Sequence, residues 1–119
     1  MLPSIACRFK LVSIFHAEGA PVYATMGFAS GLGALAGISA AGLTVSEMNL
    51  DNNRVTFSGL PFPLRLRKVL EDSSDLASAR AVWKATNNTN SFNFLIGSAA
   101  DAATPGADGA NALETIRGL

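Results

Sequence analysis

The chain has 119 residues, which predicts one domain spanning residues 1–119 around a single hydrophobic core. Its 9 basic and 9 acidic side chains give a net charge of zero, which argues against DNA, RNA or an anionic membrane surface as a partner. One cysteine and one histidine exclude an internal disulfide and a Cys/His metal site, and we expect neither a metal nor another cofactor. Hydrophobic residues make up 49% of the chain and charged residues only 15%, so we expect much of its surface to contact other protein.

The N-terminal segment, Met1–Phe15, is predicted to form a strand. Its apolar run ends at Cys7, and its positive charges, Arg8 and Lys10, follow that run. A signal peptide has the opposite order, with the positive charges first. The segment therefore lacks the pattern of a secretion signal.

The Gly-rich stretch SGLGALAGISAAGL, residues 30–43, allows three interpretations. The first is a dinucleotide-binding loop, because Gly31, Gly33 and Ala36 fit G-x-G-x-x-A and Asp51 lies about 20 residues after the first glycine. That motif requires a helix to follow, and the further glycines would weaken such a helix by roughly 0.5–1 kcal/mol each. The match is a weak one.

The second interpretation is a small membrane protein that spans the bilayer with residues 20–46. No residue there is charged, and the stretch is long enough for a transmembrane helix. Against this, proline, hydroxyl residues and several glycines interrupt it, and its flanks carry neither a basic cluster nor an aromatic belt.

The third interpretation, which we favour, is a set of antiparallel strands. Alternation with a period of two residues predicts strands at Val22–Met26, at Leu32–Ile38 and from Leu43 onward. The turn between the last two is Ser39–Gly42, in which Gly42 can adopt a positive φ.

The alternation slips along the third of these strands. Leu43 and Val45 are on one phase, whereas Met48 is on the other. We therefore predict a bulge or a strand end near residues 46–47, which would redirect Asn49.

Two helices are predicted after a turn at Asp51–Arg54. The apolar stripe of the first helix consists of Phe62, Leu66, Val69 and Leu70. Its wetter side carries Arg65, Lys68 and Glu71.

The second helix is predicted to begin at caps in Ser73–Asp75 and to end at residues 87–88. Its buried stripe consists of Leu76, Ala79 and Trp83. A buried strand, Phe92–Ser98, comes next, followed by a loop of small residues at 99–110 and a short strand at Ala112–Ile116. The succession of strands, helices and strands predicts the α+β class.

Four blocks in this order resemble the middle of a cysteine N-terminal-nucleophile (Ntn) hydrolase. They are GISAAGLTVSEMNL, GLPFPLRLRKVLEDSSDLASA, SFNFLIGSA and ALETI. The similarity extends over Gly19–Gly118 and is to the isopenicillin N acyltransferases, the choloylglycine hydrolases and, most closely, the acid-ceramidase-like proteins.

This resemblance implies a partial αββα sandwich, truncated at both ends, with antiparallel strands and two helices on one face. It also implies hydrolysis or acyl transfer at the amide bond of a small-molecule acyl amide, with lipid amides as the substrate class of the closest branch. In such enzymes autoproteolysis exposes an N-terminal cysteine, whose thiolate attacks the carbonyl while its α-amino group acts as the base.

Asn49 is the candidate catalytic residue, because it matches a family asparagine that supports the oxyanion hole or orients the substrate carbonyl. An amide suits that role since its NH₂ donates without carrying a charge. The alternative is a polar residue at a strand end that bonds its own backbone. Glu114 matches a family glutamate for which we expect a structural role, and Gly37 and Gly42 match hairpin glycines.

The departures from the family pattern concern the nucleophile. The family cysteine, with the arginine and aspartate that follow it, is expected upstream of Met1, and Cys7 does not match it by position. Further strands and a second oxyanion asparagine are expected beyond Leu119. We therefore expect a central fragment or a truncated gene product that is inactive alone, whose partners are the missing N- and C-terminal parts of the same fold. The alternative is a non-catalytic remnant that acts only by pairing with other chains.

Two further residues have weak functional signals. Asn87-Asn88-Thr89 is a glycosylation sequon, and the resemblance implies a lysosomal or secreted protein, although no signal peptide supports that address. His16, the lone histidine, is expected to be an exposed residue rather than a general base.

Overall fold

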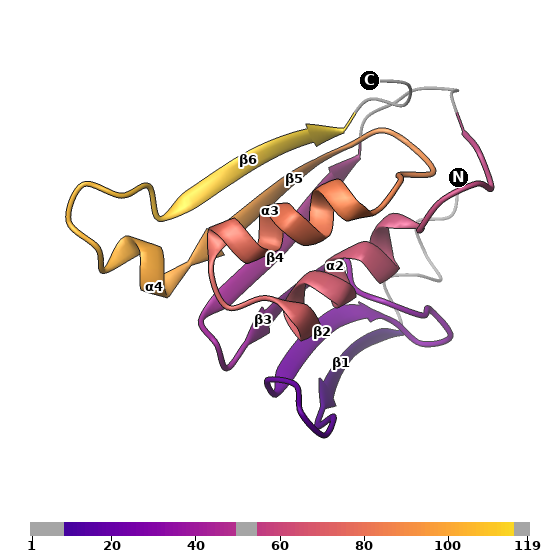
Figure 1. Cartoon of the computed structure of the whole chain (residues 1–119). Coiled ribbons are helices and arrows are strands. Elements are labelled where there is room, and N and C mark those ends of the chain that lie inside the picture. Colours follow the sequence, from indigo (N-terminus) through magenta and orange to yellow (C-terminus); the bar gives the residue numbers. More distant parts are fainter. Residues whose placement is uncertain (1–8, 50–54, 116–119) are drawn as a thin grey trace.

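The computed structural model describes residues 9–49 and 55–115, which form an α+β fold with one antiparallel sheet and helices packed against it (Figure 1). The strands are β1 (Lys10–Phe15), β2 (Tyr23–Phe28), β3 (Ala36–Ser39), β4 (Leu43–Asn49), β5 (Phe92–Ser98) and β6 (Ala110–Thr115). The helices are α2 (Phe62–Asp72), α3 (Leu76–Ala85) and α4 (Ala99–Ala102). The predicted α+β class is thereby confirmed.

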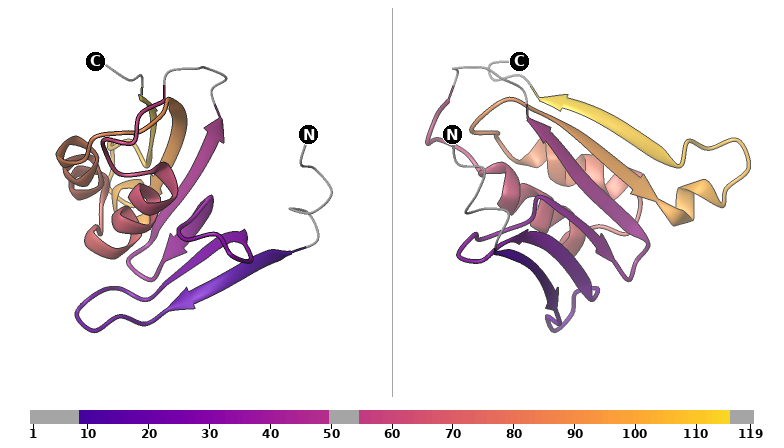
Figure 2. Two further views of the ribbon diagram at one scale, coloured as in Figure 1. Left: turned by 90° about the vertical axis from the view of Figure 1, so that its right-hand side faces the viewer. Right: turned by 180° about the vertical axis from the view of Figure 1, so that it is seen from behind.

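The six strands lie in the sheet in the order in which they occur in the sequence, and each is antiparallel to its neighbours. Helices α2 and α3 connect β4 to β5 and lie together on one face, as the side view in Figure 2 shows. The described part of the molecule is thus a two-layer structure, with a helix layer on one side of the sheet.

The Gly-rich stretch folds as part of this sheet. Gly42 adopts φ 85° in the turn between β3 and β4, as predicted. The strand expected at Leu32–Ile38 begins only at Ala36, because residues 29–35 form a loop. A strand rather than a helix follows the G-x-G-x-x-A match, so the dinucleotide-loop interpretation is wrong.

The membrane-helix interpretation is also wrong, since residues 20–46 contain β2, β3 and the start of β4. Among the described residues, none of the helices combines the length and the apolar character needed to cross a bilayer.

Helix α2 begins at Phe62 with a proline in its first turn and buries Leu66, Val69 and Leu70 as predicted. The placement of Arg65 on the wetter side is wrong, because Arg65 is only 2% exposed. Its guanidinium donates to Thr86 Oγ1 at 2.9 Å, to the Trp83 carbonyl at 2.8 Å and to the Thr86 carbonyl at 3.0 Å. Arg65 therefore supplies hydrogen bonds to carbonyl groups at the C-terminal end of α3, where backbone carbonyls have no N–H partner within the helix.

Helix α3 begins as its capping sequence predicts. Asp75 is the N-cap, and its carboxylate accepts from the backbone N–H of Ser78 at 2.7 Å, while the Ser78 hydroxyl accepts from the backbone N–H of Asp75. Leu76, Ala79 and Trp83 form the predicted buried stripe. The helix ends at Ala85, a little before the predicted end at residues 87–88.

The C-terminal part differs from the prediction in one element. Strand β5 matches the predicted bounds, and β6 begins slightly before the predicted Ala112. The expected loop at 99–110 contains the short helix α4, because the Ser98 hydroxyl accepts from the Asp101 backbone N–H and caps its first turn.

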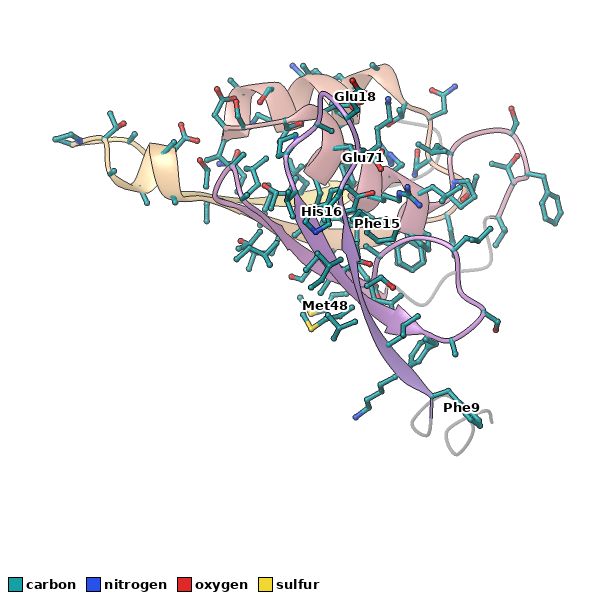
Figure 3. All side chains as sticks on the ribbon, turned by 90° about the horizontal axis from the view of Figure 1, so that it is seen from below. Phe9, Phe15, His16, Glu18, Met48 and Glu71 are labelled. Carbon is teal, nitrogen blue, oxygen red and sulfur yellow. The ribbon has the colours of Figure 1, made fainter. Side chains whose placement is uncertain are left out.

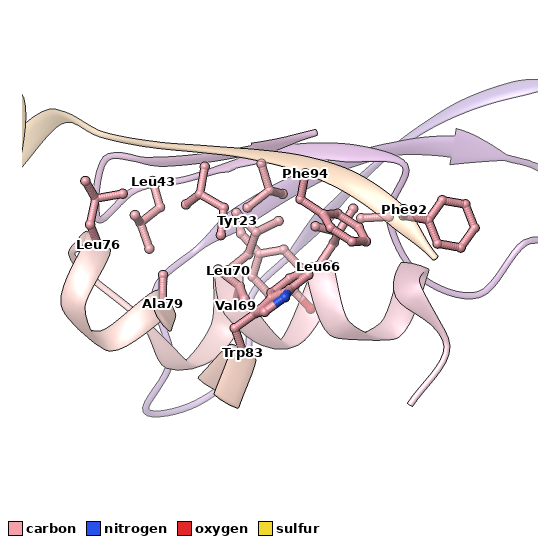
Figure 4. Packing of buried hydrophobic residues seen from close by; sticks show 13 residues of the cluster. Tyr23, Leu43, Leu66, Val69, Leu70, Leu76, Ala79, Trp83, Phe92 and Phe94 are labelled. Atoms are coloured by element: carbon pink, nitrogen blue, oxygen red, sulfur yellow. The ribbon is translucent and has the colours of Figure 1, made fainter. Parts of the chain in front are cut away.

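The hydrophobic core lies between the sheet and the helix layer (Figure 4). Its buried members are Tyr23, Ala34, Leu43, Val45, Leu66, Val69, Leu70, Leu76, Ala79, Trp83, Phe92, Phe94 and Ile96. Gly37 permits the closest approach of the layers, since an added Cβ would lie 2.5 Å from Leu70 Cδ1.

The opposite face of the sheet, which we call the open face, is apolar. No helix or strand among residues 9–49 and 55–115 covers it. Its large apolar side chains that are more than half exposed are Val12, Ile14, Met26, Ile38, Met48 and Leu95. Figure 3 shows Met48 on the side of the sheet away from the helices.

Candidate functional site

The candidate site is the end of the sheet where β4 stops. Asn49 pairs with Phe92 on β5, and Phe92 pairs with Thr115 on β6, next to Glu114. Asn49 and Thr115 are therefore two strand spacings apart, about 10 Å between backbones. The sheet brings the two residues carried over from the family resemblance, Asn49 and Glu114, to the same end but not to the same face, because Asn49 is in register with Phe92 on the helix-facing side and Glu114 with Asn93 on the opposite side. Their side chains lie outside what the structure describes.

An aromatic cluster packs against the helix-facing side of this strand end. The Phe62 ring, from the first turn of α2, lies 4.1 Å from the Phe92 ring, centroid to centroid. Phe94 lies 5.9 Å from Phe92 and 4.4 Å from Trp83 of α3. Such contacts contribute roughly 0.5–1.5 kcal/mol per pair beyond burial, so they fix β5 and, through its hydrogen bonds, the backbone at Asn49.

Glu47 is a candidate that the sequence patterns did not identify. It lies two residues before Asn49, and its backbone N–H donates to the Leu35 carbonyl at 3.2 Å. Its Oε2 atom is buried and has no hydrogen-bond partner among the described residues. Burial raises the pKa of the Glu47 carboxyl above its ordinary value, as is common for acids and bases at functional sites.

The interruption of the alternation between apolar and polar residues along β4 is not caused by the predicted bulge. The pairing of β4 with β5 continues without interruption from Leu43 to Asn49, so the bulge prediction is wrong. Instead, a polar residue, Glu47, occupies a core-facing position, and an apolar one, Met48, is 68% exposed on the open face. A polar residue at a core-facing strand position was the signal that could have identified Glu47.

The open face has a shallow hollow of about 380 Å³ over strands β2 to β5. Small side chains, Ala36, Thr44 and Ser46, line its floor, and Met26, Ile38 and Leu95 border it. Asn93 pairs with Met48 and is the half-buried amide nearest to Asn49 along β5. The open face therefore combines an apolar surface with an amide group at one end.

A second cavity, of about 590 Å³, lies between the β1–β2 turn and the C-terminal end of α2. Figure 3 labels Glu18 and Glu71, which are among its lining residues. Three carboxylates, Glu18, Glu71 and Asp72, are among its lining residues. Glu71 bonds Tyr23 and Arg67, and Asp72 bonds Lys68, so two of the three charges are already compensated. No group of residues suited to hold a metal ion occurs in the described part of the chain.

The remaining candidate residues fall outside the strand-end site. His16 is exposed in the β1–β2 turn, as predicted. Asn87 of the sequon is exposed beyond the end of α3. Cys7 and the predicted turn at Asp51–Arg54 lie outside the described residues.

Comparison with protein-family models and with curated proteins gives no match to this chain.

Proposed function

We propose that this chain is one α/β half of a cysteine Ntn amidohydrolase or acyltransferase, acting on the carbon–nitrogen bond of small acyl amides, with lipid amides as the preferred class. The proposal rests on the resemblance of the four sequence blocks and on the architecture that those blocks adopt. It assigns the nucleophilic thiol to the other half of the sandwich.

The observation that carries the proposal is the one-sided cover of the sheet. Helices lie on one face, while the opposite face exposes six large apolar side chains from five different strands. An αββα sandwich needs such a half, because each of its sheets has helices outside and the other sheet inside. The two long helices, α2 and α3, lie on the same face of the sheet, as such a half requires.

In the proposed enzyme, Asn49 assists the carbonyl of the substrate at the rim of the sheet, because by register it alternates with Glu47 on the helix-facing side and is the last residue of β4. Its NH₂ group donates a hydrogen bond to the oxygen that becomes negative when the thiolate attacks, and this stabilises the tetrahedral intermediate. The aromatic cluster beneath Phe92 keeps the strand end in place for that purpose. Burial raises the pKa of the Glu47 carboxyl, which disfavours a second negative charge near the developing oxyanion.

The test uses the protein isolated from its natural source under native conditions. It is incubated with N-acyl amides of increasing chain length, and mass spectrometry measures the released acid and any acyl-thioester on the protein. The expected result is acid release with an acylated N-terminal cysteine on a mature subunit, and the Asn49→Ala variant should reduce kcat by about 10²–10³-fold. Asn111→Ala, a substitution of the same kind toward the other end of the sheet, serves as the control and should retain activity. Absence of both acid release and a thioester with every amide contradicts the proposal.

A second candidate function is a non-catalytic chain that acts by pairing with another chain. The open face favours it as well, since an apolar sheet surface of this size needs a cover in either case. The acyl-thioester decides between the two candidates, because only the first forms one.

A further inference from the structure

We infer that two copies of the 119-residue chain associate through their open faces to form a closed, twofold-symmetric dimer with four layers. The inference concerns the chain itself and stands whether or not the proposed catalytic function holds. In this dimer, the open face of each copy is covered by the open face of the other.

The area of the open face is in the range that a stable dimer needs. Its six large apolar side chains are between 52% and 68% exposed. At about 100 Å² each they present roughly 600 Å², and their small neighbours bring the surface close to the ~800 Å² per partner of a standard interface. The largest apolar patch of an ordinary monomer is only about 300–600 Å². The apolar area of the open face is therefore at the upper end of what an ordinary monomer exposes.

The charge of the face permits contact with an identical face. By register, two charged residues belong to this face, Lys10 on β1 and Glu114 on β6, and they lie on the two opposite outer strands of the sheet. The whole chain has a net charge of zero, so two copies do not repel each other at long range. A partner chosen by opposite charge would need a charged face, which these residues do not supply.

The shape of the face is complementary to itself. The hollow of about 380 Å³ has a floor of small residues on β3 and β4 and is bordered by Ile38 on one side and Leu95 on the other. A twofold axis near the hollow places the Leu95 side chain of each copy over the hollow of the other. Sheets packed in this way lie about 10 Å apart with their strands rotated by about 30°, which leaves room for interdigitated side chains.

A dimer formed through this face closes, because each copy uses its single open face once. Association through the strand edges would behave differently. Strands β1 and β6 are the outer strands of the sheet, and pairing along them extends into larger assemblies.

The test is sedimentation velocity of the purified 119-residue chain over a micromolar concentration series. The expected result is a monomer–dimer equilibrium without larger species. Leu95→Lys places a charge beside the hollow of both faces and should weaken the dimer by about tenfold per copy, or about a hundredfold in Kd. The matched control is Leu32→Lys, the same substitution at a residue that is 83% exposed in the β2–β3 loop, and its dimer should be unchanged.

A second variant separates loss of the dimer from loss of folding. Ile38→Thr keeps the branched side chain that suits a strand and should also weaken the dimer, with a circular dichroism spectrum like that of the unaltered chain. A monomer at all concentrations overturns the inference, as does a series of growing assemblies. Equal weakening by Leu95→Lys and Leu32→Lys overturns it too. None of these results bears on acyl-thioester formation, so failure of the inference and failure of the proposed function are distinguishable.

Discussion

The substitution Arg65→Met should destabilise the protein strongly, although Arg65 lies on a helix whose sequence pattern assigns it to solvent. Three hydrogen bonds from the charged guanidinium would be lost, each contributing about 1.5 kcal/mol. Removal of a buried charge offsets about 1–2 kcal/mol of that loss. Burial lowers the pKa of Arg65 to about 10, so the group is still a cation near neutral pH. The net expectation is a decrease of about 3 kcal/mol in the free energy of unfolding, or about 10 °C in Tm.

Trp83 provides the assay, because it is the only tryptophan and the Arg65 guanidinium lies 4.1 Å from its ring centroid. Urea unfolding would be followed by Trp83 fluorescence and by circular dichroism. The control is Lys68→Met on the same helix, where the cation is exposed and pairs only with Asp72, and we expect little change in stability. If Arg65→Met and Lys68→Met have the same effect, Arg65 does not hold α3 in the way described.

Three further predictions concern individual residues. Tyr23 is the only tyrosine, and its pKa is raised from 10.0 to about 12, first by burial and then by its hydrogen bond to a carboxylate. Ultraviolet absorbance should therefore detect tyrosinate formation with a midpoint near the higher value. A midpoint near 10 would contradict the packing of Tyr23. Because the Tyr23 hydroxyl keeps its proton to a higher pH in the folded protein than in the unfolded chain, the free energy of unfolding should fall as pH rises above 10.0. Glu47→Gln should raise the free energy of unfolding by about 0.5–1 kcal/mol near neutral pH, because the buried carboxyl disfavours its charged form. That gain should vanish in denaturant titrations below pH 4.5, where the carboxyl is protonated in both states, and a gain independent of pH would be inconsistent with burial of the charge. Gly33→Ala should lower the free energy of unfolding by about 2 kcal/mol, and Tm by several degrees, because φ is 111° and the new Cβ would lie 2.6 Å from Pro63. The control is Gly106→Ala, whose new Cβ would have no neighbour within 4 Å and which should be milder. Equal effects of the two substitutions would refute the clash at Gly33.

Local signals predicted most of the fold. The turn at Gly42, the capping sequence at Asp75 and the apolar stripe of α3 depend on residues close in sequence, and all three occur where expected. Strand β5 was recognisable because its apolar residues are dense and its ends are marked by small polar ones. These features are determined by local backbone and side-chain preferences, which a sequence displays directly.

The errors arose where tertiary contacts override the local pattern. Arg65 is buried because the last carbonyls of α3, eighteen or more residues later, need a donor. Polar Glu47 occupies a core-facing position and apolar Met48 is exposed, the reverse of the usual arrangement. This reversal interrupts the alternation along β4, and we therefore predicted a bulge there. The open face could not be recognised from periodicity, since apolar residues on both phases of a strand also occur in sheets that are covered on both sides.

The candidate site was predictable only in part. The resemblance named Asn49, and the register of the sheet places it at the same end as Glu114. Whether that end assists an acyl transfer stays a prediction, because the groups that complete such a site belong to the other half of the proposed sandwich.

If the open face is a packing surface, as proposed above, methionine oxidation should reveal its cover. Met26 and Met48 are 53% and 68% exposed on that face in the isolated chain. The protein isolated from its source would be treated with dilute peroxide under native conditions, and peptide mass spectrometry would compare the oxidation rate of each methionine with its rate in the unfolded protein. We expect both methionines to be strongly protected in the native protein. Oxidation of both at the unfolded rate would show that the open face is in contact with water, and would contradict the proposed half-sandwich and the dimer alike.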